Sequence, residues 1–140
     1  MILFDIFTHF PNQFPLMETI ISALVAFALG TFWYHPKVLG DKWAEAHSLQ
    51  KEIKLGPLAY VLGLFLWMVT SAIYSFLTQF LTPPTIEALL GLSTFLWVGF
   101  ILPSHLISGF YTGNRLMVAA VDSSYYLAGL YLFAVIHDVL

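Results

Sequence analysis

The sequence predicts an all-α fold: a four-helix transmembrane bundle with an amphipathic cytoplasmic surface helix between the first and second spans. Two observations lead to this prediction. Four apolar stretches, each long enough to cross a bilayer, fill most of the 140 residues. Hydrophobic residues make up 59% and charged residues 9%, with a mean hydropathy of +0.84, whereas a soluble domain has roughly 25% charged residues. We therefore expect an integral membrane protein whose first partner is the lipid bilayer.

The four predicted spans are continuous apolar runs. A helix needs about 20 apolar residues to cross a hydrocarbon core of roughly 30 Å, and the runs reach this length. A transmembrane β-strand would alternate apolar and polar residues, whereas the third run is apolar on all sides. The predicted helical spans are residues 16–34, 58–81, 86–109 and 116–139.

The first 15 residues precede the first span and carry four Phe residues at helical spacing, Phe4, Phe7, Phe10 and Phe14. This spacing places the rings on one helical face, which is typical of a segment lying against lipid headgroups. A signal peptide would have a basic start and a small-residue cleavage site, and neither is present. We predict an interfacial segment over residues 1–15 and a single four-helix transmembrane domain over residues 16–140.

The connection between the first two spans, residues 35–56, predicts a surface helix. Leu39, Trp43, Ala46 and Ile53 fall on one helical face, and most charged residues lie elsewhere, so the segment is amphipathic. Gly56 followed by Pro then ends it and begins the second span, because Pro is tolerated in the first turn of a helix.

The later connections are short. Residues 82–85 read Thr-Pro-Pro-Thr, which ends one helix and offers Thr82 or Thr85 as N-cap of the next. Within the third span, Pro103 removes a backbone donor and exposes the carbonyl of Gly99. We therefore expect a kink in the third span.

The positive charges predict the orientation of the protein. All five lie in two connections on one side of the membrane, at Lys37, Lys42, Lys51, Lys54 and Arg115. Lys and Arg in short loops stay in the cytoplasm, so both termini are predicted outside it, with a bacterial inner membrane as the expected location. Basic residues do not cluster outside the first loop, and we predict no nucleic-acid partner.

Small residues form stripes at intervals of four on two spans: Ser22, Ala26 and Gly30 on the first, and Ala120, Ser124 and Ala128 on the fourth. Helices in lipid pack where small residues let backbones approach. We expect these stripes to meet each other, or one of them to form an oligomer contact.

A candidate polar cluster lies at the cytoplasmic side of the bundle. Asp122 is about 9 Å inside the fourth span at 1.5 Å per residue, and a carboxylate there is a functional-site hypothesis because its burial is costly. His105 lies at a similar depth and titrates near neutral pH. The candidate members of an ion or substrate site are His105, Asn114, Arg115, Asp122 and His35. In the alternative, Arg115 and His105 only satisfy Asp122 and hold the third and fourth helices together.

A second polar stripe lies in the outer half of the second span. Ser71, Tyr74, Ser75 and Thr78 recur at helical spacing, and Glu18 lies at the same side. They are candidates to line a cavity that opens outward; in the alternative, the hydroxyls bond back to their own helix. Near the same interface, Glu87, His137 and Asp138 are expected to be solvated.

The residues indicate no metal site and no assigned cofactor. The chain has no Cys, which excludes thiolate ligands and thiol nucleophiles, and no spacing of His and acidic residues supports a metal site. No nucleophile, base and oxyanion-hole arrangement is visible. The only enzyme hypothesis is a lipid-acting one, with His105 and Asp122 as an acid and base pair.

One segment resembles a known family. Gly30, two residues, Trp-Tyr, one residue and Pro36 are followed by Gly40 and by Lys42 and Trp43. This resembles the pattern of a small bacterial-type membrane family called domain of unknown function 1761, and the resemblance extends from Met17 to the C-terminus. Leu stands at position 39 where the pattern has Phe, and Asp stands at position 122 where it has Asn. The resemblance implies a four-helix integral membrane domain and no assigned activity.

These observations favour a small membrane protein that binds or conducts a small solute or ion. We expect a homo-oligomer, because a single four-helix bundle rarely encloses a pore. The alternative is an accessory or assembly subunit of a larger membrane complex that has no activity of its own.

Overall fold

The computed structural model describes residues 14–35, 38, 56–113 and 115–140, and these residues form helices and no strand. The elements are α2 (Leu16–Trp33), α4 (Pro57–Leu81), α5 (Ile86–Leu96), the π-helical turn η2 (Trp97–Ile101), α6 (Leu102–Thr112) and α7 (Leu116–Val139). The all-α prediction is confirmed. The predicted interfacial segment 1–15 and the predicted surface helix between residues 35 and 56 fall almost entirely outside the described residues and stay predictions.

The described residues contain four spans that are long and apolar enough to cross a membrane. They are Leu16–Trp33, Pro57–Leu81, Ile86–Thr112 and Leu116–Val139. The third span is continuous through α5, η2 and α6. Their surfaces carry large exposed apolar side chains such as Phe65 and Phe95, which suits contact with lipid chains. The protein is an integral membrane protein with a four-helix transmembrane fold.

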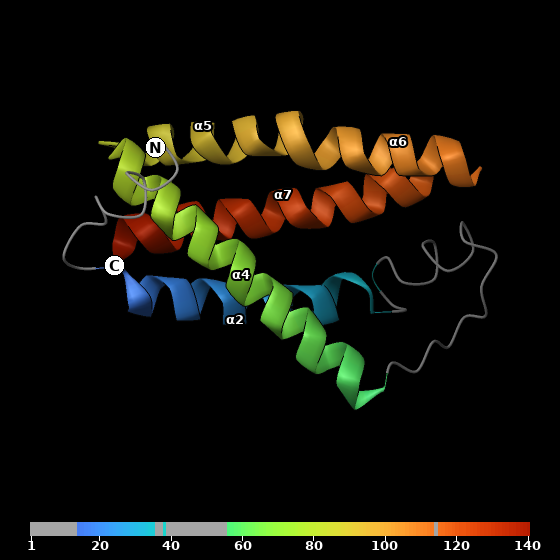
Figure 1. The fold of residues 1–140 in the computed structure, drawn as a ribbon, viewed down its shortest axis with the longest axis horizontal. Coiled ribbons are helices and arrows are strands. Elements are labelled where there is room, and N and C mark those ends of the chain that lie inside the picture. The colour runs from blue at the N-terminus through green and yellow to red at the C-terminus, as the bar shows by residue number, and fades with distance from the viewer. Residues whose placement is uncertain (1–13, 36–37, 39–55, 114) are drawn as a thin grey trace, which may run out of the picture.

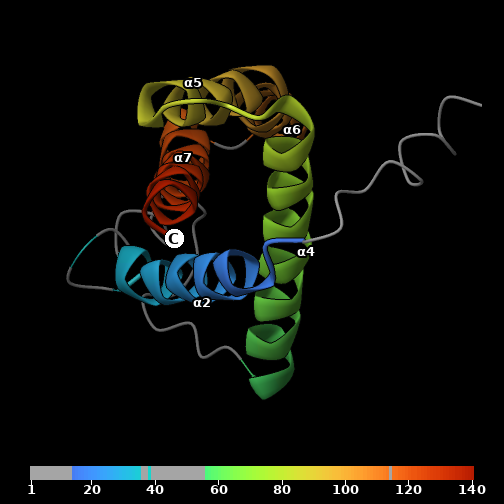
Figure 2. The same cartoon turned by 90° about the vertical axis from the view of Figure 1, so that its left-hand side faces the viewer.

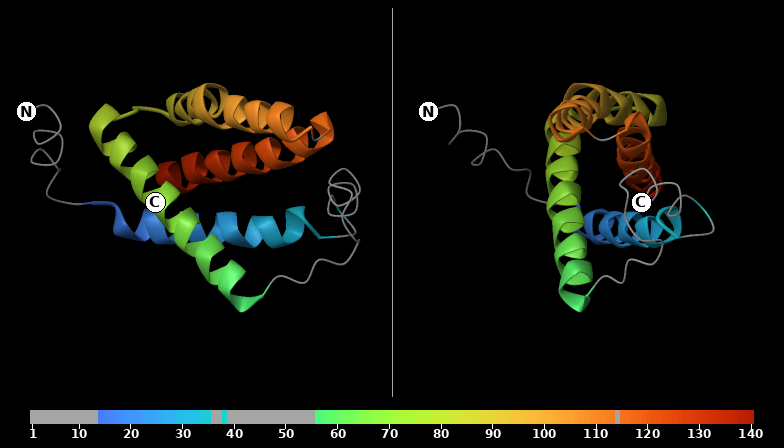
Figure 3. Two further views of the ribbon diagram at one scale, coloured as in Figure 1. Left: turned by 45° about the vertical axis from the view of Figure 1, so that its right-hand side comes forward. Right: turned by 90° about the vertical axis from the view of Figure 1, so that its right-hand side faces the viewer.

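Three of the spans lie side by side, and α4 crosses them. Figure 1 shows α5 with α6, then α7, then α2 in one layer, with α4 running diagonally over α2 toward the start of α5. In Figure 2, α5 and α6 run along the top, α7 lies at the left, α2 runs along the bottom from beneath α7 to α4, and α4 stands at the right. The main helix pairs are α2 with α4, α2 with α7, and α7 with the α5–η2–α6 span. Figure 3 shows the same crossing from two further sides.

We name the two ends of the bundle after His137 and Asp122. At the His137 end, α2 and α5 begin and α4 and α7 end; at the Asp122 end, α2 and α6 end and α7 begins (Figure 1). This alternation is what four consecutive crossings require.

Local sequence explains where the helices start and stop. Gly56 is the N-cap of α4, and Pro57 occupies its first turn, where a missing N–H costs nothing. Thr82 ends α4 in the left-handed conformation with φ of 45°. The Thr85 hydroxyl accepts a hydrogen bond from the Ala88 N–H at 3.2 Å, so Thr85 is the N-cap of α5.

The predicted kink in the third span is a π-helical turn placed just before Pro103. In η2 the Leu102 N–H donates to the carbonyl of Trp97, five residues earlier, and such turns accommodate an interrupted hydrogen-bond ladder. The hydroxyl of Ser104 donates to the carbonyl of Phe100. Nδ1 of His105 contacts the carbonyl oxygen of Ile101 at 2.8 Å. The side chains that follow Pro103 thus bond to the carbonyls of Phe100 and Ile101 in the turn before it.

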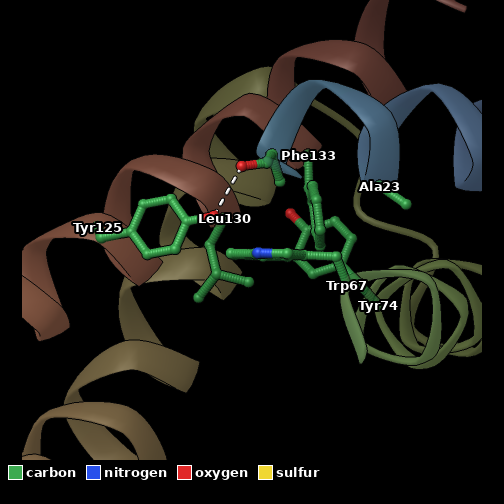
Figure 4. Close-up of a cluster of buried hydrophobic side chains, with 7 residues drawn as sticks. Ala23, Trp67, Tyr74, Tyr125, Leu130 and Phe133 are labelled. Carbon is green, nitrogen blue, oxygen red and sulfur yellow. Dashed lines mark hydrogen bonds between the residues drawn. The ribbon is translucent and has the colours of Figure 1, made fainter. Parts of the chain in front are cut away.

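The core is built from aromatic rings contributed by α4 and α7, packed on small residues of α2. Trp67 contacts the ring of Phe133 at 5.6 Å between centroids and that of Tyr125 at 5.3 Å, both edge-to-face. The Tyr125 hydroxyl donates to the Ala26 carbonyl at 2.8 Å, the bond drawn in Figure 4. The buried core cluster is Ala23, Ala26, Trp67, Tyr74, Tyr125, Leu130 and Phe133.

Two glycines allow this close packing. A Cβ at Gly129 of α7 would lie 2.6 Å from Cη2 of Trp67, and a Cβ at Gly30 of α2 would lie 2.5 Å from the Tyr125 hydroxyl. The small-residue stripe of α2 therefore meets α7, but through Tyr125. In the expected partner stripe on α7, Ala120 is exposed and Ser124 and Ala128 are half-buried, so the alternative of an oligomer contact stays a prediction.

Candidate functional site

Asp122 lies in the second turn of α7, half-buried, with an aromatic partner from another helix. Its Oδ1 accepts a hydrogen bond from the Tyr34 hydroxyl at 2.5 Å. Tyr34 is the C-cap of α2, and its backbone N–H bonds to the carbonyls of Gly30 and Phe32. The end of α2 thus sets the position of the phenol over the carboxylate.

Aromatic rings surround this pair. Tyr125 and Tyr126 follow Asp122 by three and four residues and therefore share its helical face. Neighbouring ring centroids lie between 5.3 and 6.4 Å apart. We call this set the aromatic cluster: Trp33, Tyr34, Trp67, Tyr125 and Tyr126.

Two indole N–H groups hold the backbone on either side of the carboxylate. Nε1 of Trp33 donates to the Val121 carbonyl at 3.1 Å, and Nε1 of Trp97 donates to the Ser123 carbonyl at 2.7 Å. These bonds come from α2 and from η2, so both neighbouring spans are fixed to α7 at the residues flanking Asp122.

The surroundings of Tyr34 keep its phenol protonated, so that it donates a hydrogen bond to Asp122. Burial, together with the hydrogen bond to Asp122 and its charge, raises the pKa of Tyr34 above its ordinary value. The phenol therefore stays protonated at physiological pH and donates to the carboxylate. Within the part of the chain that the structure describes, Oδ2 of Asp122 accepts no hydrogen bond and no basic side chain forms a salt bridge with the carboxylate.

The predicted polar cluster is only partly assembled. His105 contacts the Tyr126 ring, with centroids 5.5 Å apart, so it is next to the aromatic cluster but its Nδ1 bonds to its own helix. Arg115 is the N-cap of α7 and is exposed, as is His35. Asn114 lies outside the described residues. Asp122 is thus held by Tyr34, which sequence reasoning did not select, and the role of the five predicted residues stays a prediction.

The predicted outer stripe faces neighbouring helices. The Ser71 hydroxyl donates to the carbonyl of Thr19 on α2 at 2.8 Å. The Tyr74 hydroxyl bonds to that of Ser93 on α5 at 2.8 Å, and Ser93 donates to the Leu130 carbonyl of α7 at 3.0 Å. These side chains are buried and join all four spans; a cavity lined by them stays a prediction.

The rest of this stripe continues to the end of the bundle. Oγ of Ser75 lies 2.6 Å from Oγ1 of Thr19 and 2.8 Å from Nε2 of His137. Thr78 bonds back to the carbonyl of Ser75 at 2.7 Å, as the alternative interpretation expected. Glu18 is half-buried in the first turn of α2, at the same end of the bundle as His137.

His137 differs from expectation. Glu87 and Asp138 are exposed as expected, but His137 is half-buried and bonded to α4. The sequence places His137 in the last turn of the fourth span, at the same end as the hydroxyl stripe of α4. It does not give the rotation of the two helices about their axes, which decides whether His137 faces this stripe.

No group of three His, Cys, Asp or Glu side chains within the described ranges could hold a metal ion. The arrangement offers instead the Asp122 carboxylate, one oxygen of which accepts no hydrogen bond from the described part of the chain, next to a set of aromatic rings.

A family model described as "Protein of unknown function (DUF1761)" matches residues 17–137 of the chain. Searches of curated proteins and of solved structures found no match.

Proposed function

The chain belongs to the DUF1761 family, whose description assigns no function, and from this premise we propose that it binds a small cationic solute or ion through Asp122 and the aromatic cluster. The observation that carries the proposal is that Oδ1 of Asp122 accepts the Tyr34 hydrogen bond while Oδ2 accepts none from any described residue. A carboxylate within a membrane span is costly unless it is paired, hydrogen-bonded or wetted.

The surroundings of Asp122 suit a cation in two ways. An ionised carboxylate attracts positive charge, and the faces of Trp and Tyr rings attract cations through their quadrupoles. All five rings of the aromatic cluster lie in one connected set of contacts around Trp67 and Tyr125. Tyr34 donates to one carboxylate oxygen and so orients the other. Among the described residues, no basic side chain is paired with the carboxylate, which favours a cation over an anion.

The orientation follows from the charges. The connection between α2 and α4, with its four Lys residues, and Arg115 both belong to the Asp122 end. We therefore propose that the Asp122 end faces the cytoplasm, with both termini on the other side of a bacterial inner membrane. The cation would then meet the site from the cytoplasmic side.

Binding can be measured by the fluorescence of Trp33 and Trp67, which belong to the aromatic cluster. Purified protein in detergent is titrated separately with Na⁺, K⁺ and tetramethylammonium. We expect saturable quenching by at least one of them, and affinity about tenfold to hundredfold lower in Asp122→Asn, the range for losing a charged contact.

The matched control is Asp138→Asn, the same change at an exposed acid at the other end of α7. It should leave the titration unchanged. Absence of saturable quenching by all three cations, or equal affinity in Asp122→Asn and wild type, would refute the proposal.

A second candidate function is an accessory or assembly subunit. The first half of α4 extends beyond α2 (Figures 1 and 2) and exposes a row of apolar side chains: Leu58, Val61, Leu62, Phe65 and Leu66. This row supports contact with lipid, with a second copy of the chain or with a larger membrane complex. A homo-oligomer would be consistent with transport of the cation, since a single bundle rarely encloses a pore.

A further inference from the structure

The His137 end carries a chain of hydrogen-bonding groups that starts and finishes at backbone carbonyls. Nδ1 of His137 contacts the Phe133 carbonyl at 2.8 Å, and Nε2 contacts Oγ of Ser75 at 2.8 Å. Oγ of Ser75 contacts Oγ1 of Thr19 at 2.6 Å, and Oγ1 of Thr19 contacts the Pro15 carbonyl at 2.7 Å. This row of hydrogen-bonding groups connects α7, α4 and α2.

Counting protons along this chain gives its charge state. Carbonyl oxygens only accept, so each of the four contacts needs one proton from an imidazole nitrogen or a hydroxyl. The two hydroxyls supply one proton each and a neutral imidazole supplies one, which leaves one contact without a proton. A doubly protonated imidazole supplies two, and every contact is then a hydrogen bond.

From this count we infer that Thr19, Ser75 and His137 form a proton-binding site in which His137 takes up the proton. In the protonated state, Nδ1–H donates to Phe133, Nε2–H to Ser75, the Ser75 hydroxyl to Thr19 and the Thr19 hydroxyl to Pro15. In the neutral state, one contact of 2.6–2.8 Å would join two lone pairs, so that contact must lengthen. Uptake of the proton therefore tightens the junction of the three helices.

The groups around the ring act in both directions. The Glu18 carboxylate lies in the first turn of α2 at the same end of the bundle, and the C-terminal end of the α7 dipole favours positive charge at His137. Half-burial opposes the charge by desolvation. The ring of Tyr74 on α4 is edge-to-face with the imidazole at 5.2 Å, and Glu87 of α5 and Asp138 of α7 are exposed. The site lies at the opposite end from Asp122 and does not depend on cation binding there.

The test is a titration of the His side chains in lipid nanodiscs, followed by ¹⁵N NMR from about pH 5 to pH 9, the range in which His charges. The sequence has five His residues, and the signal of His137 is the one lost in His137→Gln. We expect both of its nitrogens to carry protons at the acid end. At the alkaline end Nδ1 alone should carry one, because the Phe133 carbonyl needs a donor.

The decisive comparison uses Thr19→Val, which removes the hydroxyl and keeps the shape. Without it, the remaining contacts are satisfied by a neutral imidazole and the Ser75 hydroxyl, so the proton affinity of His137 should fall about threefold to tenfold. Thr70→Val is the control, because the Thr70 hydroxyl is exposed and bonds only to its own helix; it should leave the titration unchanged. Thr19→Ser restores a hydroxyl and should restore the wild-type midpoint, which separates the proposal from a folding defect.

Two results would overturn the inference. One is a His137 that stays neutral at about pH 5 in the wild type, the acid limit of ordinary His titration. The other is a midpoint in Thr19→Val that equals or exceeds that of the wild type and of Thr19→Ser.

Discussion

Adding one methyl group at Gly129 tests how tightly α4 and α7 pack. The new Cβ would lie 2.6 Å from Cη2, 3.2 Å from Cζ3 and 3.5 Å from Cζ2 of Trp67. The ring has little room to move, because it is 7% exposed and is packed on three other aromatic rings. Overpacking of this kind costs about 1–3 kcal/mol.

Helix propensity works in the opposite direction, since Ala is favoured over Gly by about 1 kcal/mol in a helix. The matched control is Gly91→Ala in α5, where no atom lies within 4 Å of the added Cβ. Both variants gain the same propensity, so Gly129→Ala should be less stable than Gly91→Ala by the steric cost alone, about 1–3 kcal/mol.

The assay is reversible unfolding in mixed micelles with a rising fraction of sodium dodecyl sulfate, followed by Trp fluorescence. A double-mutant cycle with Trp67→Phe identifies the contact, because Phe lacks the outer ring atoms that meet the added Cβ, and the cost of Gly129→Ala should shrink in that background. The reasoning is refuted if Gly129→Ala and Gly91→Ala are equally stable, or if Trp67→Phe leaves the cost unchanged.

Two further substitutions test the neighbourhood of Asp122 by the same unfolding assay. Tyr34→Phe removes the donor to the carboxylate and should destabilise the protein by about 1–3 kcal/mol. Tyr60→Phe removes an exposed phenol that has no hydrogen bond to another described residue and should change stability little; equal effects would contradict the assigned bond. Gly30→Ala should displace the Tyr125 hydroxyl, which lies 2.5 Å from the new Cβ, and be less stable than Gly91→Ala by about 1–3 kcal/mol; equal stability of these two variants would contradict this packing.

The spans could be predicted from the sequence because their signals are local. Apolar runs of sufficient length place the four helices, and Gly56 with Pro57 and the Thr-Pro-Pro-Thr turn ending at Thr85 set boundaries that the structure confirms. The departure from regular helix near Pro103 was also local. The π-helical form of this departure was not predicted from the sequence, and Trp97 at its start bonds to the Ser123 carbonyl of another span.

The partners of the polar residues could not be predicted. Spans that are apolar on nearly all sides carry little information on their rotation about their own axes. Tyr34 and Asp122 are separated by 88 residues, and only the packing of α2 on α7 joins them. Ser75 and His137 are separated by 62 residues. Sequence reasoning selected Asp122 and the Ser71 to Thr78 stripe as polar residues inside spans, but it did not identify their hydrogen-bond partners on other helices.

The most direct measurement of cation binding is native mass spectrometry of the detergent-extracted protein, comparing wild type with Asp122→Asn and Asp138→Asn. We predict a small cation or cationic molecule retained by the wild type and by Asp138→Asn and lost from Asp122→Asn. The same spectra give the oligomeric state. A wild-type protein that carries no cation, or a bound cation that persists in Asp122→Asn, would contradict the proposed site at Asp122.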